Sequence, residues 1–520
     1  MIMSEQELKL HVPKPARATV KAAMHRGAVT RVRLRAQYFD TPERALVKAG
    51  ISLRLRQEGR IWVQTLKMSG PNPLSRLELN HRRPDATLDL SVYDDSPAKK
   101  SLVKAAKSLS VSYETDIQRL FRRIRSPAGV VEVAFDVGQI KAGGLVLPVS
   151  EVEFELVSGQ LQAVFLLGLK WQAAHHLILD LRSKAERGDR LAALAQQLAG
   201  LGDAQESATA AARAAAVASF WAPRPVMPIS LKASMNCEQS LACVTLECLE
   251  QIARNSAVLA EVDTASICQA GTPEHVHQLR VGIRRLRSCW SLYKDLAPLP
   301  PDAWREAVKD HFCALGTTRD DDVLRESLMP VLNAAGQPPV EFTRHHDNHS
   351  AMHLARSVPY QRWLIEMLAW AVDGHPIQTP SALTDDTSAH PANLKTTLKK
   401  KLFKWHQRVL SDGLKFDALE IEAKHDLRKR AKRLRYGLQF SESLLPAAKL
   451  KSYRKQLSRI QDILGEMNDL YVAREKFEGI RDNQPPAWFA VGWIASRLAV
   501  LDKEAKTAFS ELKGADHFWD

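Results

Sequence analysis

Charged and apolar side chains alternate in five short segments within the first 160 residues. In "EQELKL", Glu5, Glu7 and Lys9 occupy alternate positions, while Leu8 and Leu10 have the other parity. Side chains two positions apart in a β-strand point to the same face, so each segment is expected to form a strand with one charged and one apolar face. The other charged sets are Arg54 with Arg56, Arg76 with Glu78, Glu132 with Asp136, and Glu151 with Glu153 and Glu155.

An ordinary half-exposed sheet accounts for one or two strands of this kind, since their charges would simply face water. Five strands that carry both signs of charge favour a closed antiparallel barrel with a polar interior, packed on its outside against helices. Two carboxylates about 4 Å apart repel each other by on the order of 4 kcal/mol at an effective dielectric constant of about 20, so such an interior needs a proton or a cation. Carboxylate oxygens select Mg²⁺, Mn²⁺ or Ca²⁺, and basic groups opposite them would hold the oxygens of an anion that the metal bridges.

The composition changes along the chain in a way that predicts two domains. Up to residue 160, runs such as "ISLRLRQ" and "VVEVAFDVGQI" are separated by turn residues and indicate an antiparallel sheet. Residues 183–218 are rich in Ala and Leu and are expected to be helical, and "APRPVMPIS" at 222–230 suits a linker. We therefore expect an α+β domain in residues 1–200, a helical and Pro-rich linker in 201–231, and an all-α domain in 232–515.

The helical domain contains an internal repeat. A Pro-containing segment at 373–393 separates two halves, at about 232–372 and 394–515. Each half contains a His followed by basic residues 3, 7 and 10 positions later, a spacing that places all four on one face of a helix. These residues are His277, Arg280, Arg284 and Arg287 in the first half, and His425, Arg428, Lys432 and Arg435 in the second. If the halves pack around a pseudo-twofold axis, both stripes can line one basic groove.

The chain has 520 residues and a formal net charge of +14, which indicates several domains and a polyanionic partner such as nucleic acid, anionic lipid or polyphosphate. The polar start has no signal-peptide pattern, and no run of about 18 uncharged apolar residues indicates a membrane span. The six cysteines lie between Cys237 and Cys313 without a CxxC pair. We therefore expect unpaired thiols in a reducing compartment and a cytoplasmic protein.

The N-terminal motifs resemble those of the CYTH superfamily, the triphosphate tunnel metalloenzymes. "EQELK" resembles the ExExK signature, and the resemblance continues in order through "YFDT", "LRLR", "QTLK", "RLE", "FDVGQIKAG", "EVEFEL" and "SKAERG". It implies an eight-stranded antiparallel β tunnel with flanking helices that binds a triphosphate together with Mg²⁺ or Mn²⁺. It also implies metal-assisted hydrolysis of a terminal phosphoanhydride by water.

The resemblance further implies roles for individual residues. Metal ligands would be Glu5, Glu7, Asp136, Glu151 and Glu153. Triphosphate oxygens would be bound by Lys9, Arg54, Arg56, Lys67, Arg76, Arg119 and Lys184, and further candidates are Glu78, Arg123 and Glu155. Relatives often have a second basic residue two positions after Arg119, where this chain has Phe121. Arg122 or Arg123 can take that role, and strand parity favours Arg123.

The repeated helical motifs resemble the CHAD domain, a duplicated four-helix unit that binds inorganic polyphosphate and often follows a CYTH domain. The motifs are "HQLRVGIRRLRS", "LGTTRDDDV", "HDLRKRAKRLRY" and "LGEMNDLYV". The resemblance implies that the two basic stripes bind polyphosphate, with an association with polyphosphate granules left open. Asp320 and Asp469 are expected to orient nearby Arg or Lys side chains, and His275 is expected on the surface at a helix start.

The leading hypothesis is an inorganic triphosphatase whose tunnel cleaves tripolyphosphate and whose helical module binds polyphosphate. CYTH tunnels also include adenylate cyclases and thiamine triphosphatases, so ATP or thiamine triphosphate is an alternative substrate. A non-enzymatic polyphosphate-binding scaffold is another alternative. Nucleic-acid binding is a third, but the basic stripes lack interleaved aromatic residues for stacking and Asn or Gln for base edges, which argues against it.

Overall fold

The computed structural model describes residues 3–70, 72–201, 207–262, 271–315, 324–342, 348–373, 393–515 and 517–519. It divides into two compact units that are interleaved along the chain. Unit 1 comprises Met1–Pro225, Leu249–Leu279 and Met352–Ser381, and unit 2 comprises Val226–Cys248, Arg280–Ala351 and Ala382–Asp520. The described strands all belong to unit 1, whereas both units contain helices from the second half of the chain.

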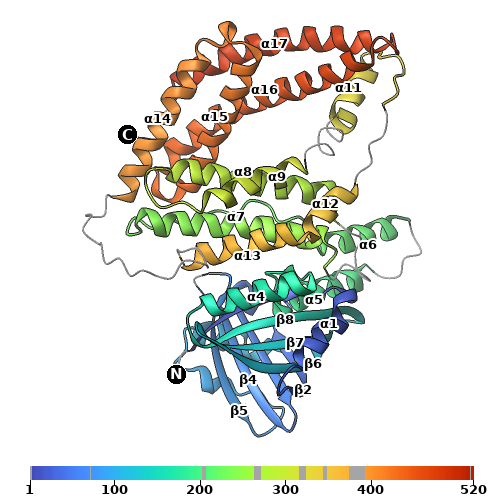
Figure 1. The fold of residues 1–520 in the computed structure, drawn as a ribbon, viewed down its shortest axis with the longest axis vertical. Helices are drawn as coiled ribbons and strands as arrows, with labels where there is room; N and C mark the ends of the chain where they lie inside the picture. Colours follow the sequence, from blue (N-terminus) through green and yellow to red (C-terminus); the bar gives the residue numbers. More distant parts are fainter. Residues whose placement is uncertain are drawn as a thin grey trace. The chain divides into compact units, whose positions relative to one another are not determined.

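Eight antiparallel strands of unit 1 close into a barrel (Figure 1). They are β1 (Met3–His11), β2 (Thr30–Asp40), β3 (Ile51–Glu58), β4 (Ile61–Ser69), β5 (Ser75–Arg83), β6 (Ser110–Ser126), β7 (Gly129–Ala142) and β8 (Leu145–Gly159). Neighbours follow the order β5-β4-β3-β2-β6-β7-β8-β1, and β1 also pairs with β5, which closes the ring. A short strand, β9 (Ile178–Leu179), pairs with β1. The predicted eight-stranded antiparallel tunnel is therefore confirmed.

The alternation of residue types places apolar side chains on the outside of the barrel. Leu8 and Leu10 on β1, and Val152 and Phe154 on β8, have no exposed surface. Helices cover these strands: α4 (Gln162–His175) packs against β1, β7 and β8, and α5 (Lys184–Gly200) packs against β6, β7 and β8. Burying an apolar side chain of this size stabilises the fold by roughly 1.5–3 kcal/mol. The charged residues of opposite parity consequently point into the barrel.

Shorter helices and segments from beyond the barrel also belong to unit 1. The remaining helices up to residue 219 are η1 (Lys14–Ala16), α1 (Arg17–Met24), α2 (Ala45–Lys48), η2 (Leu90–Tyr93), α3 (Lys99–Ala105), η3 (Ala106–Ser108) and α6 (Ser207–Ser219). One hydrophobic cluster joins Ile117 and Leu147 of the barrel, Leu191 of α5, Trp221 and Val258. Val258 lies in a later helix, so residues well past the last strand contribute to the core of unit 1.

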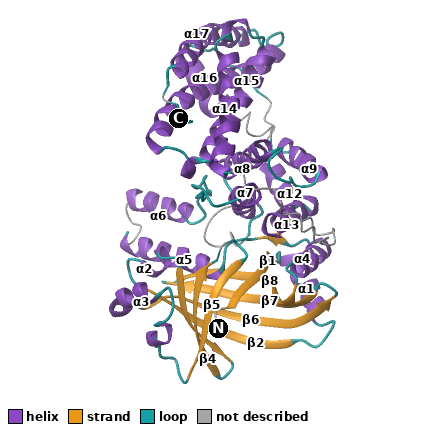
Figure 2. Cartoon of the chain, turned by 90° about the vertical axis from the view of Figure 1, so that its left-hand side faces the viewer, coloured by secondary structure: helices purple, strands orange, loops and turns teal. Residues whose placement is uncertain are grey.

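The described residues after α6 form helices and loops (Figure 2). The helices are α7 (Cys237–Leu259), α8 (Pro273–Tyr293), α9 (Asp302–Cys313), η4 (Leu324–Leu328), α11 (Met329–Ala334), α12 (Asn348–Arg356), α13 (Val358–Asp373), α14 (Leu394–Gly413), η5 (Phe416–Ala418), α15 (Ile421–Phe440), η6 (Glu442–Leu444), α16 (Ala447–Ile480) and α17 (Ala487–Lys513). The predicted all-α character of this part is confirmed.

Helices α14 to α17 form a four-helix bundle in unit 2. Contacts between α14 and α15, α15 and α16, α16 and α17, and α14 and α17 give every helix two neighbours. In α14, the buried side chains of Leu394, Leu398 and Leu402 recur every four residues and form the apolar stripe that packs in the bundle. "LGEMNDLYV" lies in α16, whereas residues 316–323 of "LGTTRDDDV" and most of the segment between the halves lie outside the described residues.

Two expectations from composition concern helices and thiols. In the part of the chain that the structure describes, no helix is both long enough and apolar enough to cross a membrane. The five cysteines in that part are free thiols, as expected, and Cys248 and Cys289 among them are buried.

Candidate active site

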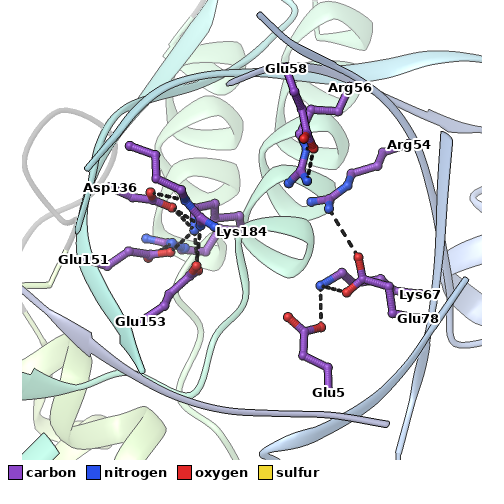
Figure 3. Close-up of polar contacts among 12 residues, drawn as sticks. Glu5, Arg54, Arg56, Glu58, Lys67, Glu78, Asp136, Glu151, Glu153 and Lys184 are labelled. Atoms are coloured by element: carbon purple, nitrogen blue, oxygen red, sulfur yellow. Dashed lines mark hydrogen bonds and ion pairs between the residues drawn. The ribbon is translucent and has the colours of Figure 1, made fainter. Parts of the chain in front are cut away.

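The interior of the barrel is lined by charged side chains of both signs (Figure 3). Asp136, Glu151 and Glu153 lie on one side of the ring together with Lys184, which extends from the start of α5. The other side carries Arg54, Arg56, Glu58, Lys67 and Glu78, and Glu5 lies below them in the same view. The side chains of each strand that share one parity therefore converge on a common space.

An acidic cluster is formed by Asp136 of β7 with Glu151 and Glu153 of β8. Asp136 and Glu151 lie directly opposite each other in the β7–β8 ladder, and Glu153 follows Glu151 on the same face. One carboxylate oxygen of each residue lies within 4.8 Å of the other two. Asp136 and Glu151 are only 1% and 2% exposed. Three buried carboxylates at this separation require positive charge among them.

Lys184 and Arg119 supply positive charge to the acidic cluster. Lys184 Nζ lies 2.8 Å from Asp136 and 2.5 Å from Glu153, and it also contacts Glu151. Arg119 on β6 donates from two nitrogens to the two oxygens of Asp136, each at 2.7 Å. Burial alone would lower the pKa of Lys184, but the three carboxylates raise that pKa well above its usual value. The cluster is thus ordered by ion pairs.

A second ion-paired group faces the acidic cluster from β1, β3, β4 and β5. Lys67 Nζ lies 2.6 Å from Glu5 and 2.7 Å from Glu78. Arg54 lies 3.7 Å from Glu78 and donates to the hydroxyl of Tyr38 at 3.4 Å. Burial opposes ionisation of Glu78, yet Lys67 holds the pKa of this carboxyl well below its usual range. Lys67 and Arg54 therefore present fixed positive charge across the interior.

Three other predicted phosphate ligands have different surroundings. Lys9 is 8% exposed, and its Nζ donates to the backbone carbonyl of Arg182. Arg56 donates to Glu58 at 2.6 Å, and burial lowers the pKa of Arg56 to about 10. Arg76 is half-buried on β5, the strand that closes the ring against β1. Lys9 and Arg56 are thus held by neighbours at the wall of the barrel.

Glu7 and Glu155 face each other in the β1–β8 ladder and have raised pKa values. Burial, together with Glu153 and Glu5, raises the pKa of Glu7 to about 8. Burial, Glu5 and Glu132 raise the pKa of Glu155 to about 7. The raised pKa values mean that too little positive charge lies near these two carboxyls to stabilise their ionised forms. A divalent cation would supply that charge. The all-oxygen donor set, the three converging carboxylates and this charge deficit together fit a hard metal ion such as Mg²⁺ or Mn²⁺.

Arg122 and Arg123 point to opposite sides of β6. Arg123 shares the parity of Arg119, donates to Glu132 at 3.2 Å and is 64% exposed. A Cβ atom built on Gly27 would lie 2.8 Å from the guanidinium of Arg122, so that guanidinium lies against the segment before β2. Arg123 therefore lies on the same face of β6 as Arg119, the face toward the barrel interior. Unlike the buried cations of the interior, Arg123 is largely exposed to solvent.

Two charged residues that were not predicted as ligands also take part. Arg187 is fully buried and donates to Glu151. It follows Lys184 by three positions, so the two lie on one face of α5, and this spacing is the signal that could have identified it. Glu58 pairs with Arg56, and its position two residues later in the same strand gives the corresponding parity signal.

The predicted basic residues of the helical region lie on α8 and α15. His277, Arg280, Arg284 and Arg287 belong to α8, and His425, Arg428, Lys432 and Arg435 belong to α15. In unit 2, the guanidinium carbons of Arg280 and Arg284 lie 4.5 and 5.5 Å from the ring centroid of Phe312. Arg428 lies 3.8 Å from Asp469, which is thereby placed to orient it, whereas Asp320 lies outside the described residues.

Lys432 shows that basic groups from both helices approach one another within unit 2. Burial, Arg428, Arg284 and Arg435 lower the pKa of Lys432 to about 7. Arg284 belongs to α8 and Lys432 to α15, so the repulsion acts between the two predicted stripes. We call Arg284, Arg428, Lys432 and Arg435 the basic cluster. A bound polyanion would relieve the repulsion within it.

His275 was expected on the surface, and this expectation is wrong. It lies in the first turn of α8, but it is only 4% exposed. Its Nε2 lies 2.8 Å from the backbone carbonyl of Trp221, and its Nδ1 accepts from the Thr272 amide at 3.0 Å. The chain after α6 covers the start of α8, a tertiary contact that helical spacing does not reveal.

Two family models match the chain. The CYTH domain model matches residues 3–188, and the CHAD domain model matches residues 244–478. An inorganic triphosphatase from Haemophilus influenzae is 34% identical over 158 residues, which are 29% of this chain and 44% of that protein. The chain therefore covers less than half the length of this curated relative.

Solved structures also resemble parts of the chain. The CHAD domain from the plant Ricinus communis is 26% identical, with a TM-score of 0.45, and the match covers 57% of this chain and 98% of that chain. A protein from Pyrococcus horikoshii is 18% identical, with a TM-score of 0.25, and the match covers 35% of this chain and 96% of that chain.

Proposed function

The chain carries a CYTH domain followed by a CHAD domain, and from this premise we propose that it is a metal-dependent inorganic triphosphatase. Its tunnel would hydrolyse tripolyphosphate, and its helical module would bind inorganic polyphosphate. The observation that carries the proposal is the barrel interior, where three converging carboxylates lie among inward-facing cations. The triphosphatase relative supports a hydrolase acting on phosphoanhydrides.

The proposed metal ligands are the acidic cluster with two carboxylates of β1: Asp136, Glu151, Glu153, Glu5 and Glu7. A divalent metal there would neutralise charge on the transferring phosphoryl group and lower the pKa of the attacking water. Lys184 contacts all three carboxylates of the acidic cluster. A phosphate oxygen would attract its ammonium group, which frees carboxylate oxygens. Metal and triphosphate are therefore expected to bind more tightly together than separately.

The proposed triphosphate ligands are the cations of the interior: Lys9, Arg54, Arg56, Lys67, Arg76, Arg119 and Lys184, with Arg123 as a further candidate. Arg54 and Lys67 lie on one wall and Lys184 on the other (Figure 3). Together with Arg119, which is ion-paired with Asp136, they would hold a linear anion from two sides. Charge-assisted bonds of this kind are roughly twice as strong as neutral ones. Glu78 keeps Lys67 and Arg54 in place when no anion is bound.

The basic cluster is the proposed polyphosphate site, together with His277, Arg280, Arg287 and His425 on the same two helices. Its support is the approach of Arg284 on α8 to Lys432 on α15, where burial and the neighbouring arginines lower the pKa of Lys432. A chain of phosphates offers one negative charge or more per unit, so it can neutralise several of these cations at once.

Phosphate release from tripolyphosphate, ATP and thiamine triphosphate, each with Mg²⁺ or Mn²⁺, tests the proposal. We expect the highest kcat/KM for tripolyphosphate and no cyclic AMP from ATP. Formation of cyclic AMP would identify an adenylate cyclase instead. Polyphosphate binding without metal-dependent turnover of any of the three would identify a scaffold.

We also propose that the functional domains are residues 1–200 and 232–515, joined by 201–231, and that the protein acts in the cytoplasm, where polyphosphate granules are one candidate location. Cell fractionation and imaging of the tagged full chain test the location.

A further inference from the structure

We propose that Arg254 is a positioning residue for the tunnel: it fixes the first turn of α5, which carries Lys184 and Arg187 to the acidic cluster. Arg254 lies in α7, within the stretch matched by the CHAD model, and its part of α7 belongs to unit 1 together with the barrel. The inference relies on the proposed function only for its kinetic measurements.

The first turn of α5 presents two different faces. Ser183 caps the helix, and its Oγ accepts from the amide of Glu186 at 3.1 Å. Lys184 and Arg187, three positions apart, both reach the acidic cluster. Glu186 lies between them in the sequence and therefore points away from that face. Whatever holds Glu186 consequently sets the orientation of the turn that holds Lys184 and Arg187.

Arg254 holds Glu186 through both of its terminal nitrogens. One nitrogen donates to Glu186 Oε2 at 3.0 Å, and the other donates to Glu186 Oε1. A Glu at this position of a helix commonly turns back to the capping residue, as in the capping box, but here both carboxylate oxygens accept from Arg254. Burial opposes ionisation, yet Arg254 lowers the pKa of Glu186. The ion pair is thus bidentate and mostly buried: 16% of the Arg254 side chain and 28% of the Glu186 side chain are exposed.

Arg254 is itself held in place. Its Nε donates to Glu250, one helical turn earlier, at 2.8 Å. The adjacent Asn255 exchanges two hydrogen bonds with the backbone of Arg224, at 3.0 and 3.1 Å. One turn further, Val258 belongs to the same hydrophobic cluster as Leu191 of α5. The end of α7 is therefore held by Glu250, by the backbone of Arg224 and by the hydrophobic cluster that also contains Leu191 of α5, and Arg254 extends from it to the first turn of α5.

Loss of Arg254 would leave Glu186 with Arg190, which lies 3.6 Å away in the same helix and cannot anchor it to another element. Small misplacements of groups that hold a reacting phosphate can cost about 10²-fold in rate. Because the other contacts between α5 and the barrel remain, we expect a smaller loss, of about tenfold in kcat.

The test uses the full chain with Arg254→Ala, Arg254→Lys and the exchanged pair Arg254→Glu/Glu186→Arg. For tripolyphosphate with Mg²⁺ or Mn²⁺, we expect kcat to fall about tenfold in Arg254→Ala and less in Arg254→Lys, and to be higher in the exchanged pair than in Arg254→Glu alone. Arg474→Ala is the matched control, since it removes an ion pair to Glu478 confined to α16, and it should stay within about twofold of wild type.

A double-mutant cycle separates positioning from general destabilisation. If Arg254 acts through Lys184 and Arg187, then Arg254→Ala should lower kcat less in the Lys184→Ala background than in wild type. The inference would be overturned if the kcat losses of Lys184→Ala and Arg254→Ala multiplied in the double variant. Wild-type kinetics in Arg254→Ala would also overturn it. Should Arg254→Ala not fold, Arg254→Lys and the exchanged pair decide by the same criteria.

Hydrogen exchange provides a measurement that needs no turnover. In Arg254→Ala, the amides of residues 184–190 should exchange faster than in wild type, and in Arg474→Ala they should not. A wild-type chain without triphosphatase activity would contradict the proposed function, whereas unchanged exchange in Arg254→Ala would contradict the positioning role itself.

Discussion

The barrel interior and the basic cluster both concentrate charge, but they do so in opposite ways. In the barrel, each central cation is shared by carboxylates, as Lys184 is by the acidic cluster and Lys67 by Glu5 and Glu78. In the basic cluster, cations from two helices crowd together, and burial with Arg428, Arg284 and Arg435 lowers the pKa of Lys432 to about 7. Ion pairs between acidic and basic side chains hold those side chains in fixed positions, which suits a reaction whose transition state redistributes charge. Charge of one sign attracts a polyanion without holding it in one geometry.

The largest expected effect lies in the barrel. Glu153→Gln removes one carboxylate from the acidic cluster and one partner from both Lys184 and Arg119. We expect kcat for tripolyphosphate to fall about 10³-fold, as for other losses of transition-state electrostatics, while polyphosphate affinity stays within about twofold of wild type. Phosphate release and isothermal titration calorimetry measure the two quantities.

The matched control for this variant is Glu442→Gln, which removes an exposed ion pair to Arg454. It should leave both quantities near the wild-type values. If Glu153→Gln kept more than about a tenth of the wild-type kcat, the acidic cluster would not be the metal site.

The second effect tests the helical side of the comparison. Arg284→Glu/Lys432→Glu reverses two charges of the basic cluster. We expect the Kd for polyphosphate to rise about 100-fold at low salt, equal to ~2.7 kcal/mol, with kcat for tripolyphosphate within about twofold of wild type. Arg454→Glu/Arg474→Glu, which reverses two charges on α16, is the control for net charge. An unchanged Kd would remove the basic cluster from the polyphosphate site.

The third effect is a pH dependence of polyphosphate binding. The pKa of Lys432 is about 7 in the free protein, and a bound polyanion raises it. Affinity is therefore fully present below pH 7 and is lost as the pH rises toward the pKa of the bound state. Between about pH 6 and pH 8 we expect the Kd to rise about tenfold. Lys432→Arg should flatten this profile, and an equal slope in both proteins would exclude Lys432 as its source.

The smallest effect concerns stability of the metal-free protein. The pKa of Glu7 is about 8 in the folded state and about 4.3 in an unfolded chain. Unfolding releases this proton between those values, so the carboxyl lowers stability progressively as pH rises from about 4 to 8. Glu7→Gln should therefore raise Tm at about pH 8 by roughly 3 °C, and by less at about pH 5. Calorimetry measures both, and a lower Tm for Glu7→Gln at pH 8 would contradict the raised pKa.

Strand parity predicts the barrel because it acts on each segment independently. The alternation around Glu5, Arg54, Arg76 and Glu151 specifies which side chains share a face, and closure then brings the faces together. The helical spacing of the two basic stripes is likewise local, and both stripes lie on single helices.

Contacts between residues far apart in the sequence could not be predicted in the same way. Parity does not show that Lys9 donates to the backbone carbonyl of Arg182, or that Trp221 covers His275. Arg254 and Glu186 are 68 residues apart in the sequence and meet only through the tertiary fold of unit 1. These contacts depend on how elements pack, for which local periodicity carries no signal.

The central claim is that metal held by the barrel carboxylates enables triphosphate hydrolysis. Its most direct test is phosphate release from tripolyphosphate by the full chain, first freed of metal by chelation and then titrated with Mg²⁺ or Mn²⁺. We expect no release from the chelated protein and saturable release as either metal is added. Release at the same rate without metal, or no release at any metal concentration, would contradict the claim.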